Sequence, residues 1–178
     1  LRSLVGTEMC IRDRTTETEN KITLDASGNA AAGDQSTENK TAEPSTLDEL
    51  FGGENLSVTY TGAEIAANYM EGGYYSLDAE QGKTFVIVGI DITNSGADEI
   101  AIDNFAKTPK FSVMVNGQEK AEEENTILPS DFALYQETVP AGVTENTILL
   151  FQVPDSVTSV DSLDLFVNIS GTNYQITL

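Results

Sequence analysis

The residue types that most enzymes use for proton transfer and nucleophilic attack are scarce in this chain. Its 178 residues contain no histidine and one cysteine, Cys10. Catalysis through an imidazole is therefore excluded, and so are histidine-containing metal sites, internal disulfides and cysteine-cluster zinc sites. An enzyme would have to use carboxylates, hydroxyls or lysine. Because no arrangement of these groups forms a recognisable site, we expect a protein that is not an enzyme.

Carboxylates dominate the charge of the chain. There are 29 acidic against 9 basic side chains, which gives a formal net charge of −20. Such a charge repels phosphate backbones and anionic headgroups, so nucleic acid is not an expected partner and a membrane would be reached only through a lipid anchor. Calcium needs six to eight oxygen ligands. If the chain binds calcium, we predict that its ligands include Asp98, Glu99 and Asp103, which are close in sequence beside a turn. A solvated acidic face is the more common role of such clusters, so no cofactor is expected.

Paired tyrosines beside glycines form the second group of candidate functional residues. Tyr74 and Tyr75 follow Gly72 and Gly73, and Tyr69 lies nearby in the sequence. Exposed tyrosines on a rigid scaffold could stack on sugar rings or anchor a protein partner. The alternative is that Tyr74 and Tyr75 lie at a sheet edge, one in the core and one half-exposed.

The elements that would position these residues are strands. Apolar residues alternate with polar ones from Leu56 onward, and turn residues recur every 8 to 12 positions, a spacing typical of sandwiches and barrels. Residues 83–93 predict a central strand with both faces buried, and Asn116-Gly117 predicts a tight hairpin followed by an acidic loop. We count seven or eight strands, namely 56–60, 83–93, 100–102, 111–115, 132–139, 147–153, 163–169 and 174–178. These predict an all-β, antiparallel β-sandwich.

The segment before the strands divides into three parts. Residues 4–14 resemble the conceptual translation of a sequencing-library adapter, so residues 1–14 are set aside and the true N-terminus is expected to lie elsewhere. Residues 15–46 are poor in large apolar side chains and predict a disordered acidic tether. Ser45 or Thr46 can cap a short helix over 46–51 that packs on the edge of the folded domain, residues 47–178.

Three stretches resemble a known family. They are GKTFVIVGIDITNSG at 82–96, VPAGVTENTILLFQVP at 139–154 and LDLFVNI at 163–169. They are similar to the immunoglobulin-like domain of unknown function found in secreted lipoproteins and antigens of Gram-positive bacteria. The resemblance implies an immunoglobulin-like sandwich, tethered outside the cell by a lipidated cysteine at the start of the mature chain. Cys10 lacks the small residues that such a cysteine follows.

These observations together give an expected function. We expect a non-catalytic binding or display module of a bacterial cell-surface or secreted lipoprotein, located outside the cell or on its envelope. The partner would be an extracellular protein or a glycan. The alternative function is a carbohydrate- or cell-wall-polymer-binding module, with calcium assisting, that uses Tyr74 and Tyr75.

Overall fold

Strands account for nearly all the regular structure of the part of the chain that the structure describes. A computed structural model describes residues 42–124 and 126–178; residues 1–41 and 125, which include the adapter-like segment and most of the predicted tether, lie outside the described part. The strands are β1 (Glu43–Pro44), β2 (Leu56–Ala66), β3 (Asn68–Glu71), β4 (Tyr75–Asp78), β5 (Lys83–Asn94), β6 (Ile100–Ala101), β7 (Lys110–Val115), β8 (Glu119–Glu122), β9 (Thr138–Val139), β10 (Thr144–Pro154), β11 (Leu163–Ile169) and β12 (Thr172–Thr177). Among the described residues, helical structure consists of α1 (Leu47–Phe51) and the 3-10 turn η1 (Phe105–Lys107). Within the described residues, neither helix is long and apolar enough to span a membrane.

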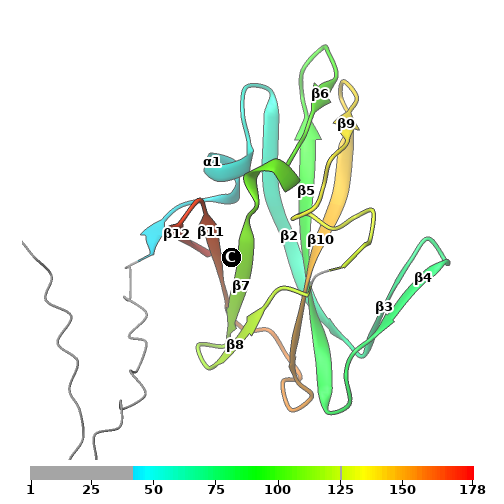
Figure 1. Cartoon of the computed structure of the whole chain (residues 1–178), viewed down its shortest axis with the longest axis vertical. Coiled ribbons are helices and arrows are strands. Elements are labelled where there is room, and N and C mark those ends of the chain that lie inside the picture. The colour runs from blue at the N-terminus through cyan, green and yellow to red at the C-terminus, as the bar shows by residue number, and fades with distance from the viewer. Residues whose placement is uncertain (1–41, 125) are drawn as a thin grey trace, which may run out of the picture. The chain divides into compact units, whose positions relative to one another are not determined.

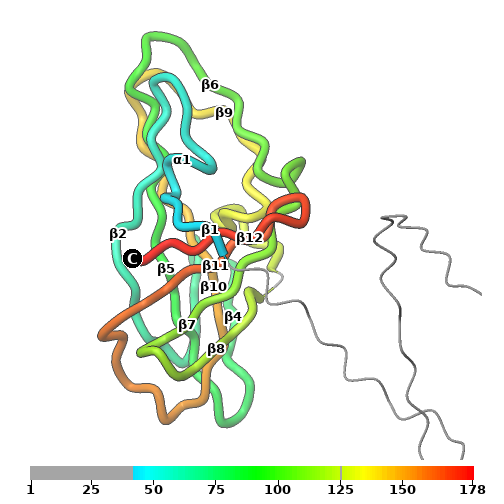
Figure 2. Tube along the Cα trace, turned by 90° about the vertical axis from the view of Figure 1, so that its left-hand side faces the viewer, coloured from blue at the N-terminus to red at the C-terminus, as the bar shows by residue number. Residues whose placement is uncertain are grey.

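Two main sheets form the two layers of a β-sandwich. The first has the strand order β10-β5-β2, and the second has the order β1-β12-β11-β7-β8. Neighbours within each sheet are antiparallel, except that β1 runs parallel to β12. Figure 1 shows the two sheets as separate layers, and Figure 2 looks onto the five-stranded sheet with β1 beside β12. The predicted antiparallel sandwich is confirmed, with eight strands in its two main sheets.

The chain crosses between the two layers in a characteristic order. It forms β2 and β5 in the first sheet, β7 and β8 in the second, β10 in the first again, and β11 and β12 in the second. Among these seven strands the first, second and fifth therefore share one sheet. Constant-type immunoglobulin sandwiches also place their first, second and fifth strands in one sheet, but their fourth strand joins that sheet, whereas here the fourth strand, β8, pairs with β7 in the other sheet.

Strand β5 is buried on both faces, as its continuous apolar pattern predicts. Val88 and Ile90 are fully buried between the two sheets, within the main core. Phe85 and Ile87 point to the opposite side and pack with Leu150 in a second apolar cluster on the outer face of the three-stranded sheet. The β3–β4 hairpin covers this second cluster, because the half-buried Tyr69 and Leu77 pack against it. The β3–β4 hairpin therefore packs on the outer face of the three-stranded sheet.

The short helix α1 forms where its capping residues predict it. The Thr46 side chain accepts a hydrogen bond from the Glu49 N–H, and the Glu49 carboxylate accepts one from the Thr46 N–H, which is a complete capping box. Gly52 ends the helix and donates its N–H to the carbonyl of Asp48. The Asp48 carboxylate in turn accepts the Val58 N–H at 2.9 Å. Helix α1 is thereby fastened to the edge of β2.

Three expectations about individual elements are wrong. Residues 132–139 do not form one strand, since only Thr138–Val139 is extended and residues 132–134 form a turn. Asn104 holds this turn: its side-chain amide donates a hydrogen bond to the Phe132 carbonyl, and its backbone N–H donates one to the Tyr135 carbonyl. The expected acidic loop after Asn116-Gly117 begins instead as strand β8. Within the predicted tether, Glu43–Pro44 pair with β12.

Candidate functional site

The β3–β4 hairpin carries the most exposed aromatic side chain of the described residues. Glu71 pairs with Tyr75, and the chain reverses through Gly72 and Gly73, both with positive φ (58° and 72°) that glycine adopts without strain. This turn leaves Tyr74 92% exposed and Tyr75 44% exposed. Figure 1 shows the hairpin projecting from the side of the sandwich opposite the five-stranded sheet. The expectation that one of these tyrosines lies in the core is therefore wrong, and both are available to a ligand.

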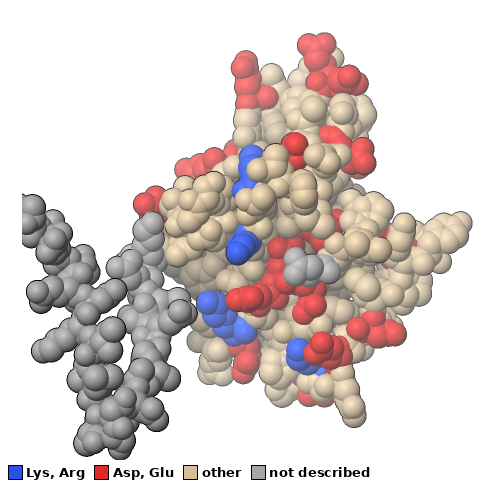
Figure 3. All heavy atoms as spheres, viewed as in Figure 1, with Lys and Arg blue, Asp and Glu red and all other residues tan. Residues whose placement is uncertain are grey.

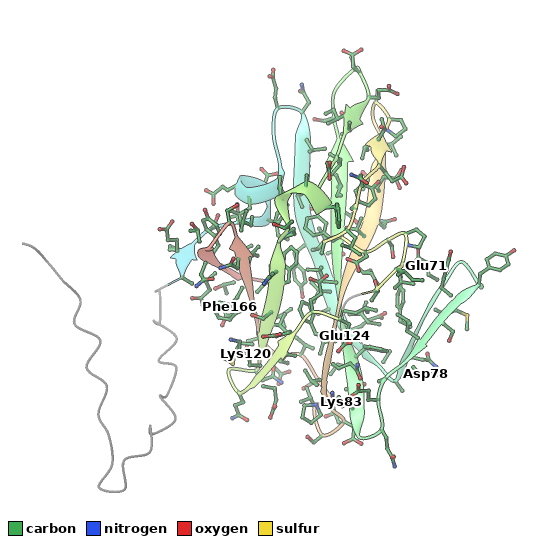
Figure 4. The ribbon with its side chains drawn as sticks, viewed as in Figure 1. Glu71, Asp78, Lys83, Lys120, Glu124 and Phe166 are labelled. Carbon is green, nitrogen blue, oxygen red and sulfur yellow. The ribbon has the colours of Figure 1, made fainter. Side chains whose placement is uncertain are left out.

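Tyr69 has a different position from the other two tyrosines. Its ring packs against the second apolar cluster, and its hydroxyl lies 3.4 Å from the Ser130 hydroxyl. Ser130 donates a hydrogen bond of 2.7 Å to the Glu71 carboxylate, which Figure 4 labels beside the hairpin. Tyr69 therefore helps hold the hairpin on the sandwich, while Tyr74 and Tyr75 form its exposed surface.

An apolar groove runs along the base of the hairpin. Its volume is about 320 Å³, and its lining includes Tyr69, Ile87 and Ile148. Strand β2 has a bulge at this point, between Tyr60 and Gly62. A side chain of a bound partner could enter this groove while the partner contacts Tyr74 and Tyr75.

A second groove beside the hairpin is acidic. It has a volume of about 350 Å³ and is lined by Glu71, Glu137 and Glu145 together with Ser130 and Asn146, among other residues. Tyr135 also lines it, and burial together with the charges of Glu145 and Glu137 raises the pKa of its phenol. No lysine or arginine contributes to this lining. The potential around the hairpin is therefore negative.

Two more apolar side chains near the hairpin escaped the sequence analysis. Met70 on β3 is 66% exposed, and Ile127 is 87% exposed in the segment that also contains Ser130. Apolar and polar residues do not alternate regularly around Met70 and Ile127, so the sequence does not indicate which of these side chains is exposed. The hydrogen bonds of Ser130 to the hairpin bring that segment beside it, and no local pattern encodes this contact.

The predicted calcium ligands are exposed but are not gathered into a site. Asp98, Glu99 and Asp103 are exposed, and Asp103 accepts the Ala106 N–H at the start of η1. The Asp98 carbonyl accepts a hydrogen bond from the buried Asn94 side chain. Among residues 42–124 and 126–178, no three Asp, Glu, His or Cys side chains are grouped closely enough to hold a metal ion. The structure thus places these carboxylates around a turn without converging them.

The structure does bring together one pair of carboxyl groups, Glu123 and Asp131. Burial, followed by the charge of Asp131 and a side-chain hydrogen bond to it, raises the pKa of Glu123 to about 9. Glu123 is therefore protonated at neutral pH. Asp131 is buried and accepts hydrogen bonds from the Thr126 hydroxyl and the Ala133 N–H. These hydrogen bonds hold the chain between Thr126 and Ala133, which follows β8 and contributes Leu128 to the second apolar cluster.

Comparisons with known proteins give only distant structural similarity. No protein family model and no curated protein matches the sequence. An uncharacterized beta-sandwich protein from Clostridium difficile 630 is similar over 71% of this chain and 87% of its own, with 18% identity and a TM-score of 0.44. A protein of Bacillus subtilis subsp. subtilis str. 168 called a putative lipoprotein (YcdA) is similar over 69% of this chain and 36% of its own, with 11% identity and a TM-score of 0.37. The YjhA protein of Bacillus subtilis is similar over 70% of this chain and 92% of its own, with 15% identity and a TM-score of 0.39. At TM-scores below 0.5, these similarities assign neither a family nor a function.

Proposed function

We propose that this chain is a non-catalytic binding module that holds a protein partner through the β3–β4 hairpin. The observation that carries the proposal is the exposure of Tyr74, 92%, at the end of a hairpin anchored by Tyr69. Tyrosine contributes a large amphipathic contact area at a small cost in conformational entropy, and it is enriched among residues that dominate binding energy. The adjacent apolar groove offers a pocket for a side chain of the partner.

The chemistry of the acidic residues supports a function without catalysis. The paired carboxyl groups of Glu123 and Asp131 are occupied by contacts within the fold, since Asp131 bonds Thr126 and Ala133. The carboxylates of the acidic groove flank the hairpin, where they would favour a partner with basic side chains around its apolar contact.

The location we propose is outside the bacterial cell, on the envelope or secreted. Its support is the resemblance of residues 82–96, 139–154 and 163–169 to the immunoglobulin-like domain of Gram-positive lipoproteins and antigens. The packing of the strands in two sheets is consistent with that resemblance. Membrane attachment would then be through a lipid anchor on a segment preceding the domain.

A random peptide library tests the role of the hairpin. Peptides selected on the wild-type domain should bind Tyr74→Ala at least about tenfold more weakly, because selection from a random library converges on the surface that provides the most binding energy. Tyr75→Ala should give a smaller loss, since that side chain is less exposed. Dissociation constants from biolayer interferometry give the comparison.

The matched control is an aromatic residue exposed elsewhere on the domain. Phe105, in η1, is 56% exposed, and Phe105→Ala should leave peptide binding unchanged. If the selected peptides bind Tyr74→Ala as tightly as wild type, the hairpin is not the binding surface. A glycan array on the same variants tests the second candidate function: glycan binding that Tyr74→Ala abolishes would assign the hairpin to carbohydrate instead.

A further inference from the structure

A groove on the opposite side of the sandwich has a different chemical character. It has a volume of about 460 Å³, within the range of about 300–1,000 Å³ typical of small-molecule sites. It lies on the outer face of the five-stranded sheet, which faces the viewer in Figure 2. We call it the Phe166 groove; its lining includes Lys110, Ser112, Glu122, Phe166, Asn168 and Asn173.

The floor of this groove is aromatic. On β11, buried and half-buried residues alternate, so Leu165 and Val167 face the core while Phe166 lies on the outer face, where Figure 4 labels it. Phe166 is paired with Ser112 on β7 and with Gln175 on β12, and both are polar. An aromatic ring on the outer face of a sheet, between polar neighbours, offers a flat apolar surface that the packing of the fold does not require.

The walls of the groove supply both donors and acceptors of hydrogen bonds. Asn168 donates to the Asn173 side-chain oxygen at 2.6 Å, and its own oxygen accepts the Gly171 N–H, so the Asn168 amide is fixed in orientation. The Ser112 hydroxyl, the Lys110 ammonium and the Glu122 carboxylate complete the set. Such a mixture suits a ligand that is itself rich in hydroxyl groups, each of which both donates and accepts.

The charges of the groove nearly cancel, in contrast with the rest of the chain. Lys110 opposes Glu122, and Glu123, the third ionisable residue of the lining, is held protonated at neutral pH by burial. The whole chain carries −20, and Figure 3 shows carboxylates spread over the visible face with few basic groups among them. An anionic ligand would be repelled by that field, and the groove itself has no excess charge to select a cation. The matching ligand is uncharged.

We propose that the Phe166 groove is a binding site for a neutral carbohydrate. One face of a pyranose ring presents C–H groups that would pack on Phe166, while its hydroxyls would bond Asn173, Ser112, Lys110 and Glu122. This site is separate from the hairpin, so the proposal stands or falls independently of the function proposed above.

Titration with neutral oligosaccharides tests the proposal. We would measure binding of cellohexaose, mannohexaose and hexa-N-acetylchitohexaose by calorimetry, and map the contacted amides by NMR chemical-shift changes. At least one of the three should bind wild type and shift amide signals of β7 and β11. Phe166→Ala and Phe166→Leu should each weaken that binding at least about tenfold, which is about 1.4 kcal/mol, because both remove the ring on which the sugar would stack.

The two Phe166 variants separate loss of the ring from loss of the fold. Leucine keeps most of the apolar volume, so Phe166→Leu should remain folded by circular dichroism even if Phe166→Ala does not. Met114→Ala is the matched control: Met114 is half-buried on the same sheet, outside the groove lining, and the variant should bind like wild type.

Three results would overturn the proposal. The first is that none of the three oligosaccharides binds wild type. The second is that binding survives in Phe166→Leu, or is lost in Tyr74→Ala instead, which would move the carbohydrate to the hairpin. The third is self-association: if sedimentation velocity shows a dimer that Phe166→Leu dissociates, the groove is an interface between two copies of this chain.

Discussion

Glu123 and Asp131 illustrate how a residue acquires its chemistry from distant parts of the chain. They are eight positions apart, and in sequence each is one of many acidic residues. The structure joins them because Glu123 bridges to Phe151 on β10 while Asp131 bridges to Ile148 on the same strand. Shared burial against β10 therefore creates the pair, and no local spacing rule could have predicted it.

The elevated pKa of Glu123 predicts a specific pH dependence of stability. The pKa is raised from 4.5 to about 9 in the folded chain, so the folded state binds more protons than the unfolded state between these values. The contribution of Glu123 to the free energy of unfolding therefore has its full value below pH 4.5, and it decreases progressively as the pH rises toward 9. Glu123→Gln, which keeps a donor to Asp131 without a proton to lose, should raise the free energy of unfolding at pH 7 by about 1–3 kcal/mol, since one pKa unit corresponds to about 1.4 kcal/mol.

Urea unfolding at pH 5, 7 and 9 measures this effect. The gain should grow with pH and nearly vanish at pH 5. Glu122→Gln is the control, because Glu122 is the adjacent exposed carboxylate and the substitution makes the same change in charge. Equal stabilisation by the two substitutions, or a gain independent of pH, would show that Glu123 is ionised in the folded state.

The tyrosines show where residue-level prediction from sequence succeeds and where it stops. The sequence offered Tyr74 and Tyr75 as exposed candidates, and both are exposed because the chain turns through Gly72 and Gly73, which adopt positive φ. The sequence could not separate Tyr69 from Tyr74, because their difference comes from Ser130, about sixty positions away. Asp98, Glu99 and Asp103, close in sequence, also show that neighbouring carboxylates need not converge.

At the scale of elements, prediction succeeded where local chemistry decides the conformation. The capping box of Thr46 and Glu49 and the burial of both faces of β5 both follow from residues within one element. The β3–β4 hairpin escaped prediction because its stability comes from packing on the outer face of the three-stranded sheet. Residues 132–135 alternate like a strand, but Asn104 supplies the hydrogen bonds that hold them in a turn.

The junction of α1 with β2 gives a prediction at this scale. A Cβ at Gly52 would lie 2.5 Å from both the carbonyl oxygen and the carboxylate of Asp48, so alanine there must displace the group that bonds Val58. Gly52→Ala should lower the free energy of unfolding by about 1–3 kcal/mol, as overpacking typically does.

The adjacent glycine provides the control for Gly52. A Cβ at Gly53 would meet nothing within 4 Å, so Gly53→Ala should change stability by less than about 0.5 kcal/mol. Chemical denaturation of both variants makes the comparison. If Gly52→Ala is as stable as Gly53→Ala, the contact between Asp48 and β2 does not stabilise the fold.

At the scale of the whole molecule, the net charge of −20 is the main electrostatic property. Within the described residues the basic side chains are Lys83, Lys107, Lys110 and Lys120, and Lys83 pairs with Glu80 at 2.6 Å. Repulsion among the carboxylates opposes the folded state, and salt screens it over a Debye length that falls from about 30 Å at 0.01 M to about 3 Å at 1 M. The urea midpoint should therefore rise as sodium chloride increases from 0.01 to 0.5 M, and a midpoint that falls would contradict this account.

The hairpin and the Phe166 groove belong to opposite layers of the sandwich. The hairpin packs on the outer face of the three-stranded sheet, and Phe166 lies on the outer face of the five-stranded sheet. Because the full thickness of both layers separates them, two ligands could dock without steric conflict. With both proposed sites occupied the domain would be bivalent, and a carbohydrate bound on one side would be linked to a protein bound on the other across two sheets about 10 Å apart.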